Sequence, residues 1–472
     1  MRRVIRASVL WLAAALPVAG PSAADPVPPS AVQTVQLQGG EVSVPRLQQA
    51  AVRAIQMQRY DLAAKIANVL LEIDPTDSYA NFVLAHAHLR GGDAVIARKA
   101  AGKAFRYAQT DTQKHEAARA AAAAAARQEQ FFAAQIWMRR AMISAPSEQI
   151  AARTAREFRG VRHEARLSFD AGFSLAPSSN VNGGASERIS TVDGLPLVGV
   201  LSPTARALSG TVAEGQITLG YRLHRSETSE TSARMSASAK RVWLSGEAQD
   251  IAPNAENGDF GSSKLEFGLL HRQALWDKGP VAAVGLNAGR AWFGGDPGYD
   301  YTRVVAGLTQ PLGARTALSL SLLQQDQRDI DGRTSDVVTQ GWQLGLTQGL
   351  WGKSRVSLSY QASETESENV QQRSVGQGLR LGFNPGKPLG PVTWSAGLSA
   401  FEADYSDFRV LIPVPGGRQD TIYGASLDLT FHKMDYAGFV PTMRLSAERS
   451  ESNVSRYETE EFSVSLGFKS RF

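Results

Sequence analysis

The sequence predicts an α+β multidomain protein, in which tetratricopeptide-like helical repeats precede an antiparallel transmembrane β-barrel of about fourteen strands. Three observations support this fold class. The chain begins with a signal-peptide pattern, and the segment after it is rich in the helix formers Ala, Leu, Gln and Arg. From about residue 162 to the end, apolar and polar residues alternate.

Composition excludes several kinds of site. The 472 residues contain no cysteine, so a disulfide framework, a zinc-thiolate site and a thiol nucleophile are impossible. The net charge of +5 is spread along the chain without a basic block, which argues against nucleic acid as a partner. The 43 glycines and abundant serine suit a protein built of strands and turns.

Residues 1–24 have the pattern of a secretory signal peptide. Arg2 and Arg3 belong to a basic start, an apolar run covers residues 7–16, and small residues ending at Ala24 form a cleavage site. The apolar run is too short to span a bilayer as a helix. We therefore expect the mature chain to leave the cytoplasm without a membrane-spanning helix.

A flexible lead-in, residues 25–43, is predicted to precede a repeat domain at residues 44–158. Small residues recur at Ala63, Ala97 and Ala134, at intervals of 34 and 37 residues. A small residue at such a position lets two paired helices approach closely. The resulting helical pairs, which resemble tetratricopeptide repeats, cover roughly 44–77, 78–111 and 115–148.

Stacked repeats form a concave groove that binds a peptide or protein segment. In the middle repeat, this register turns Tyr79, Phe82, His86, Leu89 and Arg90 toward the groove. A core position for Phe82 is an equal alternative. The aromatic and basic side chains nevertheless make this face the predicted client-binding surface.

The alternating region, residues 162–472, is predicted to form the barrel. Segments of about ten alternating residues suit tilted strands that cross a bilayer. Compact links alternate with longer, more polar ones, as do the periplasmic turns and external loops of outer-membrane barrels. The predicted strands are 164–176, 211–223, 231–244, 262–275, 281–293, 300–310, 316–327, 336–348, 354–365, 373–384, 391–404, 420–433, 441–450 and 457–472.

A large soluble antiparallel protein would alternate too, but its apolar face would point inward. The signal peptide, the link lengths and the chain end favour the membrane. Gly467, Phe468 and Phe472 resemble the terminal signal by which outer-membrane barrels are recognised and closed, although Ser470 departs from it. An even number of strands places both barrel ends, and so the repeat domain, in the periplasm.

The order of signal peptide, short repeats and carboxyl-terminal barrel resembles the surface lipoprotein assembly modulator (Slam) family, the outer-membrane component of type XI secretion. Pro177, Asn180 and Asn182 lie just after the first predicted strand and resemble a Pro-x-x-Asn-x-Asn segment of that family. Asn-rich turns also arise because asparagine bonds to its own backbone.

The resemblance implies a translocon that receives a surface or secreted client, often a lipoprotein, and exports it through or along the barrel. It implies the client, a periplasmic chaperone, the barrel assembly machinery and outer-membrane lipid as partners. We expect no enzymatic activity, no cofactor and no metal. The alternatives are a passive porin or an exopolysaccharide export channel with a periplasmic docking module.

Overall fold

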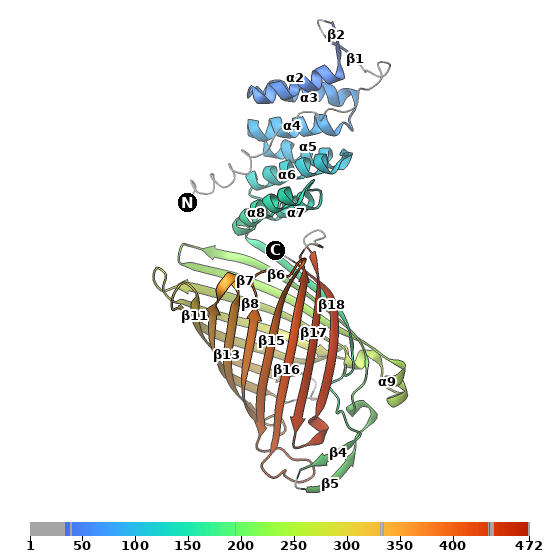
Figure 1. Ribbon diagram of the computed structural model, residues 1–472, viewed down its shortest axis with the longest axis vertical. Helices are drawn as coiled ribbons and strands as arrows, with labels where there is room; N and C mark the ends of the chain where they lie inside the picture. The colour runs from blue at the N-terminus through green and yellow to red at the C-terminus, as the bar shows by residue number, and fades with distance from the viewer. Residues whose placement is uncertain are drawn as a thin grey trace. The chain divides into compact units, whose positions relative to one another are not determined.

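The computed structural model describes residues 34–37, 40–193, 195–330, 332, 335–432, 434 and 439–470 (Figure 1). The chain divides between Arg166 and Leu167 into a helical unit and a barrel unit. The predicted signal peptide, residues 1–24, and the terminal Phe472 lie outside the described residues. In the described part of the chain, no helix has both the length and the apolar character needed to cross a membrane.

The helical unit is a series of antiparallel pairs, and short polar side chains start several of its helices. Asp77 and Asp93 each accept hydrogen bonds from two backbone N–H groups in the first turn of a helix, and Thr110 forms a capping box with Gln113. Gly92 ends one helix with a φ of 99°. The helices are α2 Val44–Gln56, α3 Tyr60–Ile73, α4 Ser78–Gly91, α5 Ala94–Tyr107, α6 Asp111–Arg127, α7 Phe131–Ile143 and α8 Glu148–Glu164.

Alanine dominates the core of the helical unit. Ala63, Ala97 and Ala134, the recurrent small residues, are all buried. Residues Ala117–Ala126 of α6 are all buried, and α6 packs against both α5 and α7. All of them except the polar Arg119 are alanines, and side chains of one carbon let neighbouring helices pack closely. The core of this unit therefore depends on close backbone approach more than on large side chains.

Two boundaries of the helical unit differ from the prediction. The expected flexible lead-in contains an antiparallel hairpin, in which β1 (Thr34–Leu37) pairs with β2 (Gly40–Ser43). At the other end, α8 continues to Glu164, so the barrel begins at Leu167 and not at residue 162. Over the few residues between 162 and 167, the alternating pattern of a strand is hard to distinguish from the periodicity of a helix.

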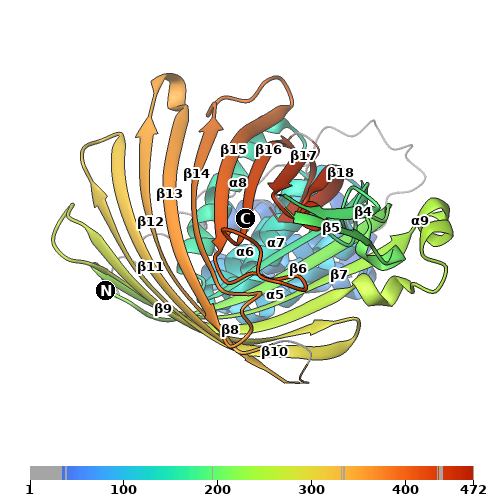
Figure 2. The same cartoon turned by 90° about the horizontal axis from the view of Figure 1, so that it is seen from below.

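Fourteen strands of the described chain close into one antiparallel barrel (Figures 1 and 2). Each pairs with its neighbours in sequence, and the first and last strands pair with each other. The predicted number of strands is thus confirmed. The strands are β3 Leu167–Ser178, β6 Gly210–Arg225, β7 Ser229–Leu244, β8 Ser262–Ala274, β9 Val281–Phe293, β10 Asp296–Pro311, β11 Thr316–Asp329, β12 Val337–Gly349, β13 Arg355–Ser367, β14 Ser374–Asn384, β15 Val392–Tyr405, β16 Arg418–Phe431, β17 Phe439–Ser452 and β18 Thr459–Ser470.

The longest connections all leave the same end of the barrel, the end opposite to the start of β3. They are residues 179–209, 245–261 and 406–417. The first contains a two-stranded hairpin, β4 (Ile189–Val192) and β5 (Leu195–Val200), and the second contains the short helix α9 (Gly246–Ile251). We call this end of the barrel the outer end, because outer-membrane barrels generally carry their long loops on the external side.

Candidate functional site

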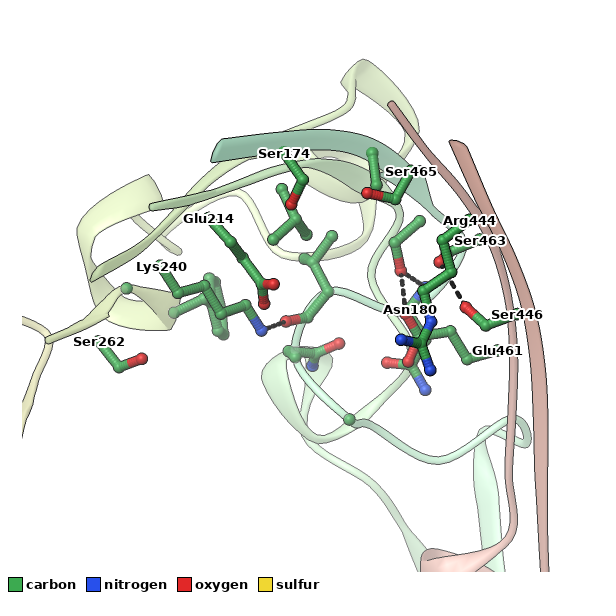
Figure 3. Close-up of a pocket in the computed structure, with 18 of the residues that line it drawn as sticks. Ser174, Asn180, Glu214, Lys240, Ser262, Arg444, Ser446, Glu461, Ser463 and Ser465 are labelled. Atoms are coloured by element: carbon green, nitrogen blue, oxygen red, sulfur yellow. Dashed lines mark hydrogen bonds between the residues drawn. The ribbon is translucent and has the colours of Figure 1, made fainter. Parts of the chain in front are cut away.

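Along each strand, alternate residues form two sets, which we call its polar and its apolar parity. The polar parity faces the barrel interior. A cavity of about 910 Å³ lies beside β3 and β18, and its lining is mostly polar (Figure 3). The lining includes Ser174, Ser178, Glu214, Lys240, Arg444, Glu461, Ser463 and Ser465. Strands from both sides of the barrel closure contribute to this one cavity, so these side chains point inward.

The opposite parity is therefore outside. On the two closing strands it carries Phe173, Leu175, Phe462 and Leu466, whose side chains are between 44% and 59% exposed. Large apolar side chains with that exposure on a closed barrel form a lipid-facing surface. The predicted arrangement, an apolar exterior around a polar interior, is confirmed, and the barrel is an outer-membrane barrel.

Serine and glycine alternate across the inner wall from β11 to β16. Three serines, Ser319, Ser357 and Ser399, each stand directly opposite a glycine on the next strand. In each pair a Cβ added to the glycine would lie 2.6 Å from the serine oxygen, so the serine leans over the space that the glycine leaves. This part of the inner wall therefore presents serine hydroxyl groups beside glycines.

The inner wall over β8 and β10 is different, because its charged groups are held in a network. The Tyr301 hydroxyl donates to Glu266 Oε2 at 2.5 Å, and Arg303 and Lys264 lie 3.6 and 3.7 Å from the same oxygen. The Lys264 ammonium also lies 4.6 Å from the centre of the Tyr301 ring. These contacts hold the charges against the wall rather than across the lumen.

Among the described residues, the ladder that closes the barrel between β3 and β18 has the fewest paired residues of any two neighbouring barrel strands. Leu466–Lys469 pair in register with Gly172–Leu175, and Ser463 pairs with Ser178, but the ladder lapses at Ala176 and Pro177. On its other side, β3 pairs with β6 without a break over its whole length. Pro177 has no N–H to donate, which is why proline is found at strand edges and irregularities.

Side chains replace the missing ladder at the outer end of this closure. The Ser178 hydroxyl donates to Glu461 Oε1 at 2.8 Å, and the Phe462 N–H donates to the Ser179 hydroxyl at 3.4 Å. At the inner end, a Cβ on Gly467 would lie 2.3 Å from the Phe173 carbonyl oxygen. Gly467, predicted as part of the closure signal, is thus the residue that lets β18 approach β3. Phe468 beside it faces outward.

The predicted junction motif folds the start of the 179–209 segment. The Asn180 amide donates to the Gly184 carbonyl and accepts from the Gly184 N–H, both at 2.8 Å. The Asn182 amide donates to the carbonyls of Thr204 and Arg206 and accepts from the Leu208 N–H. Both asparagines therefore hold backbone in place, whereas Pro177 is exposed on β3.

The 179–209 segment then reaches the loop between β17 and β18, beside which β4 and β5 lie in Figure 2. Val192 bridges to Val454, and the Ser186 N–H donates to the Glu458 carbonyl at 3.0 Å. Val192 and Val454 share a buried cluster with Phe408 and Val414 of the 406–417 loop. We call residues 179–209 the latch segment, because it follows β3 and contacts the loop that precedes β18, the two strands that close the barrel.

A buried arginine reinforces that cluster. The Arg418 guanidinium carbon lies 3.5 Å from the centre of the Tyr405 ring and 3.7 Å from that of Tyr457. Its Nε lies 3.1 Å from Asp420 Oδ2, and both side chains are buried. The 406–417 loop and the β17–β18 loop therefore both pack against one charged group, through Phe408 and Tyr457, a contact for which the sequence pattern gave no signal.

The helical unit places the five predicted groove residues unequally. Leu89 is buried with Ala97 and alanines of α6, and His86 is 2% exposed, with no hydrogen-bond partner among the residues that the structure describes. The structure therefore corrects the prediction at these two positions, because neither presents a surface to a client. Tyr79 and Phe82 are half-buried, and Phe82 packs against the alanine cluster of α4, α5 and α6. Arg90 is half-buried as well.

An ion network that the sequence did not suggest connects α6 and α8. Arg119 donates to both carboxylate oxygens of Glu157 at 3.1 Å, and its other terminal nitrogen lies 3.7 Å from Glu116. Arg153 lies 3.4 Å from Glu157. Burial raises the pKa of Glu116 above its usual value, and the nearby Arg119 opposes that rise. The network fixes α8 to the repeats.

Two outer membrane channels and one tetratricopeptide domain are among the solved structures to which parts of the chain are similar. An outer membrane channel from Pseudomonas putida F1 is 10% identical, with 64% of this chain and 94% of that chain covered and a TM-score of 0.35. The outer membrane channel DcaP of Acinetobacter baumannii is 10% identical, with 64% and 96% covered and a TM-score of 0.38. The first tetratricopeptide domain of human RPAP3 is 16% identical, with 25% and 91% covered and a TM-score of 0.23.

Likenesses at this level assign no activity. No curated protein matches the chain. A family model does match: it is described as surface lipoprotein assembly modifier and covers residues 343–472, from within β12 to the chain end. Over those residues, the carboxyl-terminal part of the barrel, the resemblance to the Slam family is confirmed.

Proposed function

We propose that this chain is an outer-membrane translocon that receives a periplasmic client on its helical repeats and exports it to the cell surface. The client is a lipoprotein or a secreted protein. The observation that carries the proposal is the match of residues 343–472 to surface lipoprotein assembly modifiers. No covalent chemistry is part of the proposal, so the protein acts as a conduit and not as an enzyme.

The lumen supports a polypeptide as the cargo. Its hydroxyl-lined wall from β11 to β16 offers hydrogen-bond partners to extended backbone, so the peptide groups stay solvated during passage. Its larger charged groups on β8 and β10 are tied to one another, so they do not bind a passing chain tightly. A track with weak, repeated contacts allows both entry and exit.

The direction of transport rests on the topology. Fourteen strands place the start of β3 and the end of β18 at the same face of the membrane, opposite the long loops. Only Ala165 and Arg166 separate α8 from β3. In the proposal, the repeats are therefore periplasmic, where they meet the client or a chaperone that delivers it, after the assembly machinery has inserted the barrel.

The test is the surface proteome of the source bacterium with and without the gene. Protease shaving of intact cells followed by mass spectrometry is expected to lose specific lipoproteins from the surface of the deletion strain while their cellular amounts persist. Full-length protein should restore them. A variant without residues 25–150 should insert its barrel and fail to restore them. An unchanged set of surface lipoproteins in the deletion strain would contradict the proposal.

A passive porin or an exopolysaccharide channel remains the second candidate, since a wide polar lumen also passes small solutes. Conductance in planar bilayers separates the two. A constitutively open pore gives steady conductance, whereas a latched translocon is expected to be closed for most of the recording. Steady conductance together with unchanged surface lipoproteins would favour the porin.

A further inference from the structure

A lipoprotein presents a physical problem to a polar channel, and the following inference rests on the proposed function. Each methylene of an acyl chain is stabilised by burial in lipid. A fatty acyl chain of ordinary length would therefore be strongly destabilised in a wet lumen. The acyl chains of such a client are far more stable in the bilayer, while its polypeptide requires the polar interior. The barrel wall must then open between them.

The β3–β18 closure is where the wall is weakest. Other neighbouring strands pair along most of their length, but here the ladder lapses at Ala176 and Pro177, and two side-chain hydrogen bonds from Ser178 and Ser179 replace it. Fewer backbone bonds must break to part these two strands than any other adjacent pair among the described strands.

The two faces of this closure suit the two parts of an acylated client. Outside, Phe173, Leu175, Phe462 and Leu466 border it with apolar surface. Inside, Ser174 and Ser463 belong to the lining of the 910 Å³ cavity (Figure 3). A slit between β3 and β18 would therefore have lipid on one side and a polar, partly charged cavity on the other.

The latch segment controls such a slit. It leaves the end of β3, is fixed by Asn180 and Asn182, and binds the loop that begins β18 through Val192 and Val454. It therefore joins the two closing strands outside the membrane, beyond the end of their backbone ladder. We propose that the β3–β18 closure is a lateral exit for the acyl chains of the client and that residues 179–209 latch it.

The test locks the closure with a disulfide. Leu175 and Leu466 stand directly opposite each other, at a Cα separation that a disulfide spans. The chain has no cysteine of its own, so Leu175→Cys with Leu466→Cys forms one defined cross-link. The matched control, Leu175→Cys with Ala213→Cys, cross-links the same position of β3 to its intact neighbour β6.

The probe is a synthetic triacylated lipopeptide with a short lysine tail and a fluorophore on that tail. Full-length mature protein is reconstituted in vesicles, and quenching by external dithionite reports movement of the probe between leaflets. Unlocked protein is expected to accelerate quenching of the inner pool. Oxidation of the Leu175–Leu466 pair should abolish that acceleration, and reduction should restore it. The Leu175–Ala213 cross-link should change nothing.

A second pair tests the latch. Val192→Cys with Val454→Cys, when oxidised, should suppress transfer as the closure lock does, since it holds the two loops together. Equal transfer in the oxidised and reduced closure lock, or no transfer by the unlocked protein, would overturn the inference. These outcomes are independent of the surface proteome. If the disulfide lock blocks probe transfer but the deletion strain keeps its surface lipoproteins, the proposed function is wrong. If the strain loses them but the lock has no effect on transfer, only the lateral exit is wrong.

Discussion

At the scale of single residues, the helical unit contains buried groups whose role is structural. His86 lies on α4 at a position that faces the groove in an ideal repeat, yet it is buried, with Phe82 at a ring distance of 6.2 Å. Burial and then the nearby Arg90 lower its pKa to about 4. The imidazole is consequently neutral in the folded protein at neutral pH.

This pKa makes the stability of the helical unit depend on pH. The unfolded chain binds a proton near pH 6.5 and the folded chain only near pH 4, so stability is complete above pH 6.5 and falls as the pH drops between these values. The loss amounts to about 3 kcal/mol at most. This loss of stability can be measured by urea unfolding of the full chain in detergent at pH 7.5 and at pH 5, with the helical circular dichroism signal as the readout. His86→Leu should lose less stability over the same range, and an equal loss would show that other groups are responsible.

Gly467 is a residue whose absence of a side chain decides a close approach. A Cβ there would lie 2.3 Å from a backbone oxygen of β3, so Gly467→Ala must push the closing strands apart. We expect a destabilisation of about 1–3 kcal/mol, measured as a lower urea midpoint of the barrel in detergent micelles. Gly215→Ala on β6 is the matched control, because no atom lies within 4 Å of its added Cβ. Equal effects of the two substitutions would contradict the assigned role.

At the scale of elements, the loops at the outer end are a packed unit and not independent connections. The latch segment, the 406–417 loop and the β17–β18 loop share one buried cluster, and Arg418 at the start of β16 lies between two tyrosine rings. Their hydrogen bonds to one another use both backbone and side-chain groups: the Asp193 N–H donates to the Asn453 carbonyl, and the Thr191 N–H donates to the Ser455 hydroxyl. Order in this region is therefore cooperative.

Arg418→Met tests that cooperativity. It removes the stacking on Tyr405 and Tyr457 and leaves the buried Asp420 without its cation, which costs about 3–5 kcal/mol when a buried pair is broken. Trypsin added to intact cells should then cleave the variant protein after Arg409, in the loosened loop. Arg373→Met is the control: its pair with Asp407 is about half-exposed and should contribute less than about 1 kcal/mol. If both variants resist trypsin equally, the cooperative packing of these loops is contradicted.

At the scale of the whole molecule, the decisive property is the direction of the apolar parity. It points outward around the barrel, and the polar parity surrounds the interior cavity. Trp243, Trp276 and Trp351 are exposed near strand ends, where the interfacial aromatic residues of outer-membrane barrels lie. Trp342 lies instead in the middle of β12, packed on Tyr360 at 5.4 Å.

The exterior predicts the solution behaviour of the purified mature chain. Without detergent it should aggregate, since a closed belt of large apolar side chains exceeds what a soluble monomer exposes. In detergent it should run on gels at different mobilities before and after boiling, as the barrel unfolds. Size-exclusion chromatography with light scattering is the measurement. A monodisperse monomer in plain buffer would be incompatible with the membrane assignment.

The sequence by itself determined the number of strands and the place of most of them, because a period of two over ten residues is a local property. It also placed Gly467 at the closure and the asparagines at the turn after β3. Its groove residues were less well predicted: His86 and Leu89 are buried because the neighbouring alanines let α4, α5 and α6 approach closely.

Only the tertiary structure decided which parity is inside, where the barrel ladder is incomplete and what the 179–209 segment contacts. Each of these depends on groups far apart in the chain. Ser178 meets Glu461, and Val192 meets Val454, through ring closure and loop packing that no local pattern records. Alternation fixes that a strand has two different faces, but only closure of the ring fixes which face meets lipid and which meets water.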